Sequence, residues 1–177
     1  MGSRLRRAAR IGAGLAAALS NPAMADTTTS FQVSATVVSG CEINGSLASG
    51  GEALGRYGLL DFGSHSSLSR DTASAAIAAD AGLTLSCTPG VALSMALGAG
   101  QHGSAVRNMQ AAGSGALLPY RLYRDAGFSN EMQIDQAYAV TFADPEAIAL
   151  PIYGRAVLSG DKPPDTYSDT IVLTLSW

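Results

Sequence analysis

Two segments, one near each end of the chain, alternate apolar and polar residues, and this pattern constrains the fold more than any other feature. The apolar positions are Phe31, Val33, Ala35 and Val37 in the first segment, and Ile171, Leu173, Leu175 and Trp177 in the second. A β-strand places every second side chain on the same face. Each segment therefore predicts a strand with one apolar face.

The C-terminal segment reaches Trp177 with the pattern of a strand that packs on a core. A sandwich normally covers such a position with one more strand, because an open apolar edge invites pairing with another chain. On the pattern alone, this edge could accept one more strand. The N-terminal segment has the apolar face to fill it, although on the pattern alone it could also pair within its own domain.

The region between these segments consists of short apolar runs that are bounded by Gly, Pro, Asn and Asp. Regular short strands with turn signals between them predict an all-β, antiparallel sandwich. The predicted strands lie near residues 31–38, 41–45, 58–62, 82–87, 91–97, 105–110, 117–123, 137–142, 148–157 and 169–177. The bland segment Thr72 to Ala81 could form a helical turn, but an edge strand or loop is the better interpretation.

Residues 1–25 have the composition of a secretory signal peptide. A basic start, with four arginines, precedes a short apolar run from Ile11 to Leu19 and the small residues around Ala23 and Ala25. This run is shorter than the ~20 residues that span a bilayer, so we expect no direct membrane insertion. Cleavage before Asp26 removes four of 11 basic residues and none of 14 acidic ones, which changes the net charge from −3 to −7. Such an acidic protein is a poor ligand for nucleic acid or an anionic membrane.

Cys41 and Cys87 are the two cysteines of the chain. In an exported protein an even pair predicts a disulfide, with two free buried thiols as the alternative. Two cysteines and two distant histidines do not have the spacing of a metal site, and we expect no metal and no cofactor.

Other constellations in the sequence are weaker. Gly98 to Gly103 matches GxGxxG, but the following residues resemble a loop rather than the helix that a dinucleotide site needs. His65 and His102 lie in loop-like sequence without a nucleophile elbow, so no catalytic residues are predicted. Asp135, Asp144 and Glu146 are acidic neighbours without a clear calcium pattern. The tyrosines and Trp177 could line a carbohydrate site, although most aromatics on sandwich strands are core residues.

The ordered set of motifs resembles the spore coat protein U domain family, the fold of archaic, Csu-type chaperone–usher pilus subunits. The resemblance covers nearly all of the chain after residue 25. The segments that carry it are Ser39 to Ile43, Leu60 to Gly63, Leu83 to Gly90, Ala96 to Gly100, Arg107 to Met109, Tyr120 to Asp125, Pro151 to Arg155 and Thr166 to Asp169.

The resemblance implies an incomplete immunoglobulin-like sandwich that is completed by donor-strand exchange. It divides the chain into a signal peptide (1–25), a donor segment (26–38) and a pilin domain (39–177). Phe31, Val33, Ala35 and Val37 would be the donor side chains, and Ile171, Leu173, Leu175 and Trp177 would form the acceptor edge. The implied partners are other copies or related pilins, a periplasmic chaperone and an outer-membrane usher.

The expected protein is therefore a non-enzymatic subunit of a surface fibre that serves attachment and biofilm formation. It would be exported through the periplasm to the cell surface or secreted. The alternative is a secreted or tip-located adhesin with lectin-like binding.

Overall fold

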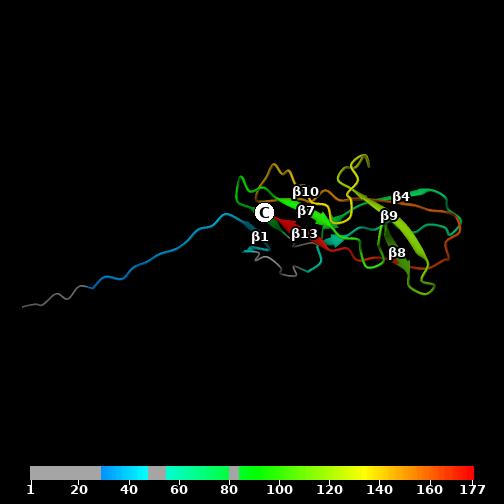
Figure 1. Cartoon of the computed structure of the whole chain (residues 1–177), viewed down its shortest axis with the longest axis horizontal. Helices are drawn as coiled ribbons and strands as arrows, with labels where there is room; N and C mark the ends of the chain where they lie inside the picture. The colour runs from blue at the N-terminus through cyan, green and yellow to red at the C-terminus, as the bar shows by residue number, and fades with distance from the viewer. Residues whose placement is uncertain (1–28, 48–54, 80–83) are drawn as a thin grey trace, which may run out of the picture. The chain divides into compact units, whose positions relative to one another are not determined.

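The computed structural model describes residues 29–47, 55–79 and 84–177, so the predicted signal peptide lies outside the described residues. The chain divides into two units, Met1–Thr36 and Val37–Trp177, and the strands belong to the second (Figure 1). The strands are β1 (Cys41–Ile43), β2 (Ser46–Leu47), β3 (Gly58–Leu59), β4 (Thr72–Ala76), β5 (Ala78–Ala79), β6 (Leu85–Cys87), β7 (Ser94–Leu97), β8 (Arg107–Ala111), β9 (Leu117–Tyr123), β10 (Tyr138–Ala139), β11 (Tyr153–Val157), β12 (Tyr167–Ser168) and β13 (Leu173–Ser176).

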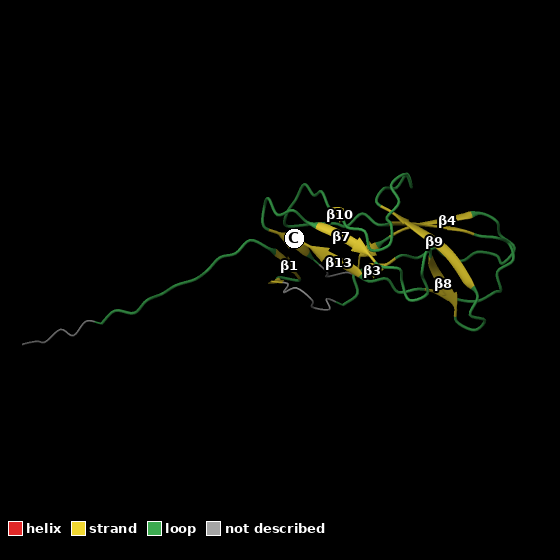
Figure 2. Ribbon diagram, viewed as in Figure 1, coloured by secondary structure: helices red, strands yellow, loops and turns green. Residues whose placement is uncertain are grey.

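The described residues contain strands and loops and no helix, as Figure 2 shows. All ladders between these strands are antiparallel. The predicted all-β, antiparallel fold is therefore confirmed. Its physical basis is the run of short segments with a period of two, since such segments bury one face of a strand and not one face of a helix.

The largest sheet has five strands in the order β12-β8-β9-β11-β4. Its central strand, β9, alternates strictly, with Leu118, Tyr120 and Leu122 buried and the residues between them exposed. A second sheet has the order β10-β7-β13, a third has the order β2-β1-β6, and β3 pairs with β5.

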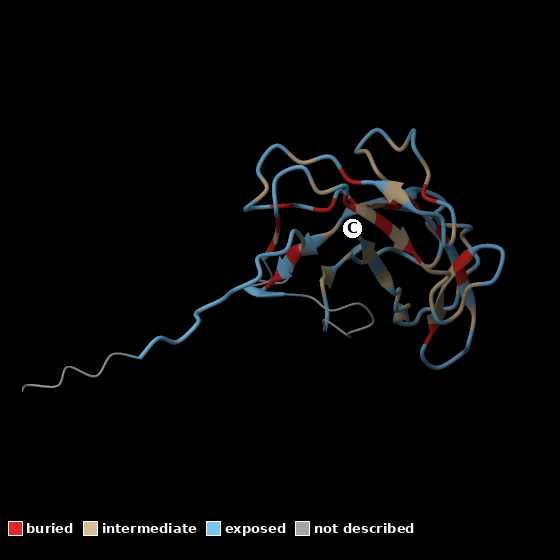
Figure 3. Ribbon diagram, turned by 60° about the vertical axis from the view of Figure 1, so that its left-hand side comes forward, coloured by how far each residue is buried: buried red, intermediate tan, exposed pale blue. Residues whose placement is uncertain are grey.

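One core joins these sheets. Its buried side chains come from β1, β6, β7, β9 and β11 and from the loop before β11, and Figure 3 draws buried segments in red. Gly154 of β11 is part of this packing, because a Cβ there would lie 2.7 Å from Leu60 and 2.8 Å from Phe62. A side chain at this position would therefore displace two apolar neighbours from the core.

Among the described residues, the charged side chain that is buried belongs to Arg107, which has 3% of its surface exposed. Its guanidinium donates hydrogen bonds to the carbonyl oxygens of Gly98, Leu97, Met132 and Gln133, at 2.7–3.3 Å. Burial lowers the pKa of Arg107 from its usual value. The side chain starts on β8 and reaches the end of β7, so it ties the five-stranded sheet to the sheet that contains β13.

Most predicted strands are present but shorter than expected. The strand near 148–157 begins only at Tyr153, because the preceding apolar residues are buried in a loop, where Leu150 donates its backbone N–H to the Tyr57 hydroxyl (3.1 Å). The segment Thr72–Ala76 is an edge strand rather than a helical turn. The predicted strand at 31–38 is not formed, since none of these residues belongs to a strand in the structure.

Candidate functional site

The C-terminal strand β13 turns apolar side chains toward the core without burying them fully. Leu173 lies opposite Leu97 and Leu175 lies opposite Met95 in the ladder with β7. Residues directly opposite each other on paired strands point to the same face. Leu97 and Met95 are 2% and 1% exposed, whereas Leu173 and Leu175 remain half-buried although they pack on the same core.

The half-burial follows from the position of β13 at the edge of its sheet. Within the described ranges, β7 is the one strand that pairs with β13, and the opposite edge of β13 has no strand beside it. Ile171, just before the strand, is also half-buried against the core. The predicted acceptor residues Ile171, Leu173 and Leu175 thus share one face along one unpaired edge.

Trp177 follows β13 and lies near the start of β1. An ideal Cβ at Gly40 would lie 3.6 Å from Trp177 Nε1 and 3.7 Å from Leu47. An open hollow of about 440 Å³ lies between Trp177, Ser39 and the segment 89–92. With 44% of its surface exposed, Trp177 presents much of its ring there. The sequence did not predict that the residues before β1 would lie beside the end of β13.

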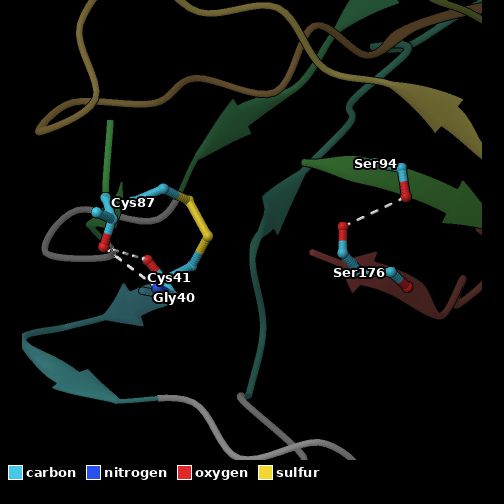
Figure 4. The surroundings of a disulfide bond; sticks show 6 residues. Gly40, Cys41, Cys87, Ser94 and Ser176 are labelled. Carbon is cyan, nitrogen blue, oxygen red and sulfur yellow. Dashed lines mark hydrogen bonds between the residues drawn. A yellow bond between two sulfur atoms is a disulfide. The ribbon is translucent and has the colours of Figure 1, made fainter. Parts of the chain in front are cut away.

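The predicted disulfide joins β1 to β6 at this end of the domain. Cys41 and Cys87 are opposite each other in the ladder, with Cα atoms 4.0 Å apart and sulfurs 2.04 Å apart. The backbone N–H of Thr88 donates to Gly40 O (2.9 Å), which extends the pairing by one residue. Figure 4 shows the disulfide together with the hydrogen bond from Ser94 Oγ to Ser176 O (3.3 Å). The Cys41–Cys87 prediction is confirmed.

The predicted donor residues lie outside any strand. Phe31, Val33 and Val37 are 85%, 81% and 94% exposed, and Ala35 is exposed as well. An extended segment with this many exposed apolar side chains is unusual for a soluble chain in its final state. The donor role of these residues stays a prediction.

Asp169 organises the chain just before β13, and the sequence did not single it out for this role. Its carboxylate accepts hydrogen bonds from the Tyr120 hydroxyl (2.6 Å) and from the backbone N–H groups of Gln101 (2.8 Å) and Thr170 (2.9 Å). Burial raises the pKa of Tyr120, and the hydrogen bond from its hydroxyl to Asp169 raises it further. Gly100 has a φ of 84°, and a Cβ there would collide with the Asp169 carboxylate.

The sequence patterns that were set aside as weak do not come together as a site within the described residues. The glycine segment 98–103 leads through a loop into β8, not into a helix. His65 Nε2 lies 2.7 Å from Phe62 O, in an exposed loop. No group of three or more His, Cys, Asp or Glu residues in the described part of the chain could hold a metal ion. Tyr120 belongs to the core, and the hydroxyls of Tyr138 and Tyr57 accept backbone N–H groups, which leaves fewer rings for a carbohydrate site.

The described residues also contain no helix with the length and apolar character that a membrane span requires.

The Spore Coat Protein U domain family matches residues 27–174. A solved structure with similarity is the CsuC–CsuE chaperone–tip adhesion subunit pre-assembly complex from the archaic chaperone–usher Csu pili of Acinetobacter baumannii, with a TM-score of 0.48 and 14% identity. That match covers 80% of this chain and 41% of the other, so this chain spans less than half the length of the chain it matches. No curated protein matches the sequence.

The family match extends from the N-terminal alternating segment into β13, and it includes both cysteines. The resemblance predicted from the ordered motifs is therefore confirmed: this chain belongs to the Spore Coat Protein U domain family.

Proposed function

We propose that this chain is a structural subunit of a chaperone–usher surface fibre and that it polymerises by donor-strand exchange. The observation that carries the proposal is the half-buried row of Ile171, Leu173 and Leu175 along the unpaired edge of β13. One added strand would cover that row and pair with the free backbone groups of β13. In physical terms this is β-augmentation.

The proposed occupant is the N-terminal segment of another copy or of a related pilin. Phe31 to Val37 has the same number of residues as Ile171 to Trp177, and both carry four apolar side chains at alternate positions. Strands of equal length and equal period can pair along their whole extent, and the period of two fixes which face enters the core. The donor residues Phe31, Val33 and Val37 are almost fully exposed in the single chain.

The gain from this exchange is large on the scale of protein stability. Full burial of one large apolar side chain stabilises by roughly 1.5–3 kcal/mol, and three of the four donor residues are large. Ala35 contributes less. Because the total free energy of unfolding of a domain is about 5–15 kcal/mol, the donor strand would supply a substantial fraction of it.

The partners follow from this mechanism. A subunit with an open edge needs protection before assembly, which is the task we assign to a periplasmic chaperone, and an outer-membrane usher would be the place of exchange. Residues 1–25 would direct export as a cleaved signal peptide, and the fibre would lie at the cell surface, where it serves attachment and biofilm formation. We assign the subunit no enzymatic role.

The decisive experiment appends residues 26–38 after Trp177 through a short flexible linker. We expect a self-complemented monomer with a clearly higher melting temperature than the chain without the addition. The control appends the same residues with Phe31, Val33 and Val37 replaced by Ser, and it should give no increase. Equal melting temperatures for the two appended chains would refute the exchange.

A second experiment separates giving a strand from receiving one. A chain that lacks residues 26–38 should still bind the added donor peptide, but it should be unable to extend a fibre. Unimpaired fibre growth by this deletion would show that the donor lies elsewhere in the chain.

A further inference from the structure

The outer face of the five-stranded sheet carries two arginines side by side. Arg121 of β9 and Arg155 of β11 are opposite each other in the ladder, and both are exposed. In the next row of the same face, Tyr123 lies opposite Tyr153, and both rings are half-buried. Like charges directly opposite each other on paired strands destabilise a sheet, so the fold tolerates an unfavourable pair here.

One of the two arginines already forms an ion pair with a carboxylate. Arg121 Nη1 donates to both carboxylate oxygens of Glu131, at 2.8 Å and 2.7 Å. In the part of the chain that the structure describes, Arg155 has no such ion pair. Its guanidinium lies instead over the ring of Phe128, 5.1 Å from the ring centre. The face thus shows one arginine with a carboxylate and a second arginine, beside it, without one.

Phe128 is held in place by a strained and well-bonded loop, which is yellow in Figure 1 between β9 and β10. Its φ is 56°, a left-handed conformation that is a clear outlier for a bulky residue. The carboxylate of Asp125 accepts the backbone N–H groups of Ser129 and Asn130 (2.7–3.2 Å), which fixes the turn. The Phe128 ring lies edge-on to Tyr123, with centroids 5.4 Å apart. Backbone strain of this kind concentrates at functional sites.

The surrounding charge makes this face distinctive. Residues 26–177 contain 14 acidic and seven basic residues, and three of the seven are Arg121, Arg124 and Arg155. Arg124 lies in the same loop region, with its guanidinium 4.7 Å from the centre of the Tyr138 ring. Three of the seven basic residues are therefore close to β9 and β11, in a region that also contains the acidic Asp125 and Glu131, and two of the three, Arg121 and Arg155, are on the outer face of the sheet.

We propose that this face binds a polysaccharide that contains uronic acid units. Arg155 would take the sugar carboxylate with its planar pair of N–H donors, as Arg121 takes Glu131. Phe128 and Tyr153 would offer apolar surface to the C–H face of the sugar ring. An acidic peptide would need the cation but not the neighbouring rings. The ring of Phe128, which a strained turn holds beside Arg155, favours the sugar. The proposal does not depend on donor-strand exchange, because the five-stranded sheet and its loop are distinct from β13.

The test measures binding of the full chain to polygalacturonate at two salt concentrations, with neutral dextran and polyglutamate as comparison polymers. We expect binding to polygalacturonate that weakens at higher salt, and little binding to the other two polymers. Arg155→Gln should weaken the binding about tenfold, the equivalent of one charge-assisted contact. The matched control is Arg70→Gln, which removes an exposed arginine in the loop before β4 and should leave binding unchanged.

A second variant tests the role of the ring. Phe128→Asn removes the aromatic surface, and asparagine tolerates the left-handed conformation, so the loop should keep its shape. We expect a loss of similar size to that of Arg155→Gln, with an unchanged circular dichroism spectrum. Equal binding to polyglutamate, no binding to polygalacturonate, or equal losses for Arg155→Gln and Arg70→Gln would each overturn the proposal.

Discussion

The five-stranded sheet and the sheet that contains β13 face the same core but cover it to different degrees. On β9 and β11, the inward-facing Tyr120, Leu122 and Ala156 are 6%, 3% and 1% exposed. On β13, the inward-facing Leu173 and Leu175 are half-buried, although their partners on β7 are buried. The same core is therefore closed on one side and open on the other.

Both sheets also end in an edge strand, and the two edges differ. The inward-facing residues of β4 are small: Ala73 is 4% exposed and Ala75 is half-buried, so little remains to be covered there. The inward row of β13 consists of larger side chains that one more strand would bury. An unpaired edge alone is therefore a weak reason to propose an acceptor site, whereas an unpaired edge with incompletely covered core residues is a stronger one.

The largest effect should come from breaking the connection between the two sheets. Arg107→Leu removes four hydrogen bonds from a charged donor and leaves buried carbonyls without partners, which should cost about 5 kcal/mol. Arg107→Lys keeps the charge but reaches fewer carbonyls, so it should fold with an intermediate loss. Urea unfolding measures both variants, and Arg70→Leu, at an exposed position, is the control. A loss below 1 kcal/mol for Arg107→Leu would remove Arg107 from this role.

The disulfide tests whether the end of the domain near β13 depends on β1. Cys41→Ser together with Cys87→Ser opens a link with a sequence separation of 46 and should cost up to about 4 kcal/mol. We expect lower yield in an oxidising compartment and a lower melting temperature. Hydrogen exchange should increase at β1 and β6 before it increases in the five-stranded sheet. A uniform increase across both sheets would show that the link supports the whole domain equally.

Met95 and Leu175 compare the closed and open parts of the core directly, because they are opposite each other in one ladder. Met95→Ala should cost about 3 kcal/mol in the single chain, the usual loss for a fully buried side chain. Leu175→Ala should cost about 1 kcal/mol there, since the side chain is only partly buried, and more in the strand-complemented form. Melting temperatures of both variants, with and without an appended donor segment, check this. Equal losses for Leu175→Ala in the two forms would contradict an acceptor role for β13.

Particular residues show which parts of the fold can be predicted from the sequence and which cannot. The strand 117–123 was predicted with its observed bounds, because its alternation is strict and its position is central in a sheet. The strand Thr72–Ala76 has a bland sequence, and only its ladder with β11 makes it a strand. Burial of Arg107 contradicts the usual exposure of charged residues, and its four acceptors come from two segments that are far apart in the sequence. Contacts of this kind depend on the packed fold, so no local pattern reveals them.

The Arg121–Arg155 pair could not be predicted from the sequence either, because only the register of β9 and β11 places the two residues opposite each other. A signal was present in the concentration of basic residues at Arg121 and Arg124 in an otherwise acidic chain. The alternation of β9 would have placed Arg121 and Tyr123 on the outer face. Their partner Arg155 required the structure.

A smaller effect than that of Met95→Ala is expected at Tyr120, which links the closed sheet to the segment before β13 through Asp169. Tyr120→Phe removes one hydrogen bond to a carboxylate and should cost about 1.5 kcal/mol at pH 7. The pKa of Tyr120 is raised in the folded state, chiefly by burial, so the folded protein holds this proton more tightly than the unfolded chain does. The stabilisation is therefore complete below the unfolded value of about 10 and is lost as the pH rises above it. Melting temperatures between pH 7 and pH 11 should fall more steeply for the wild-type chain than for Tyr120→Phe above pH of about 10, and parallel curves would show that the phenol titrates alike in both states.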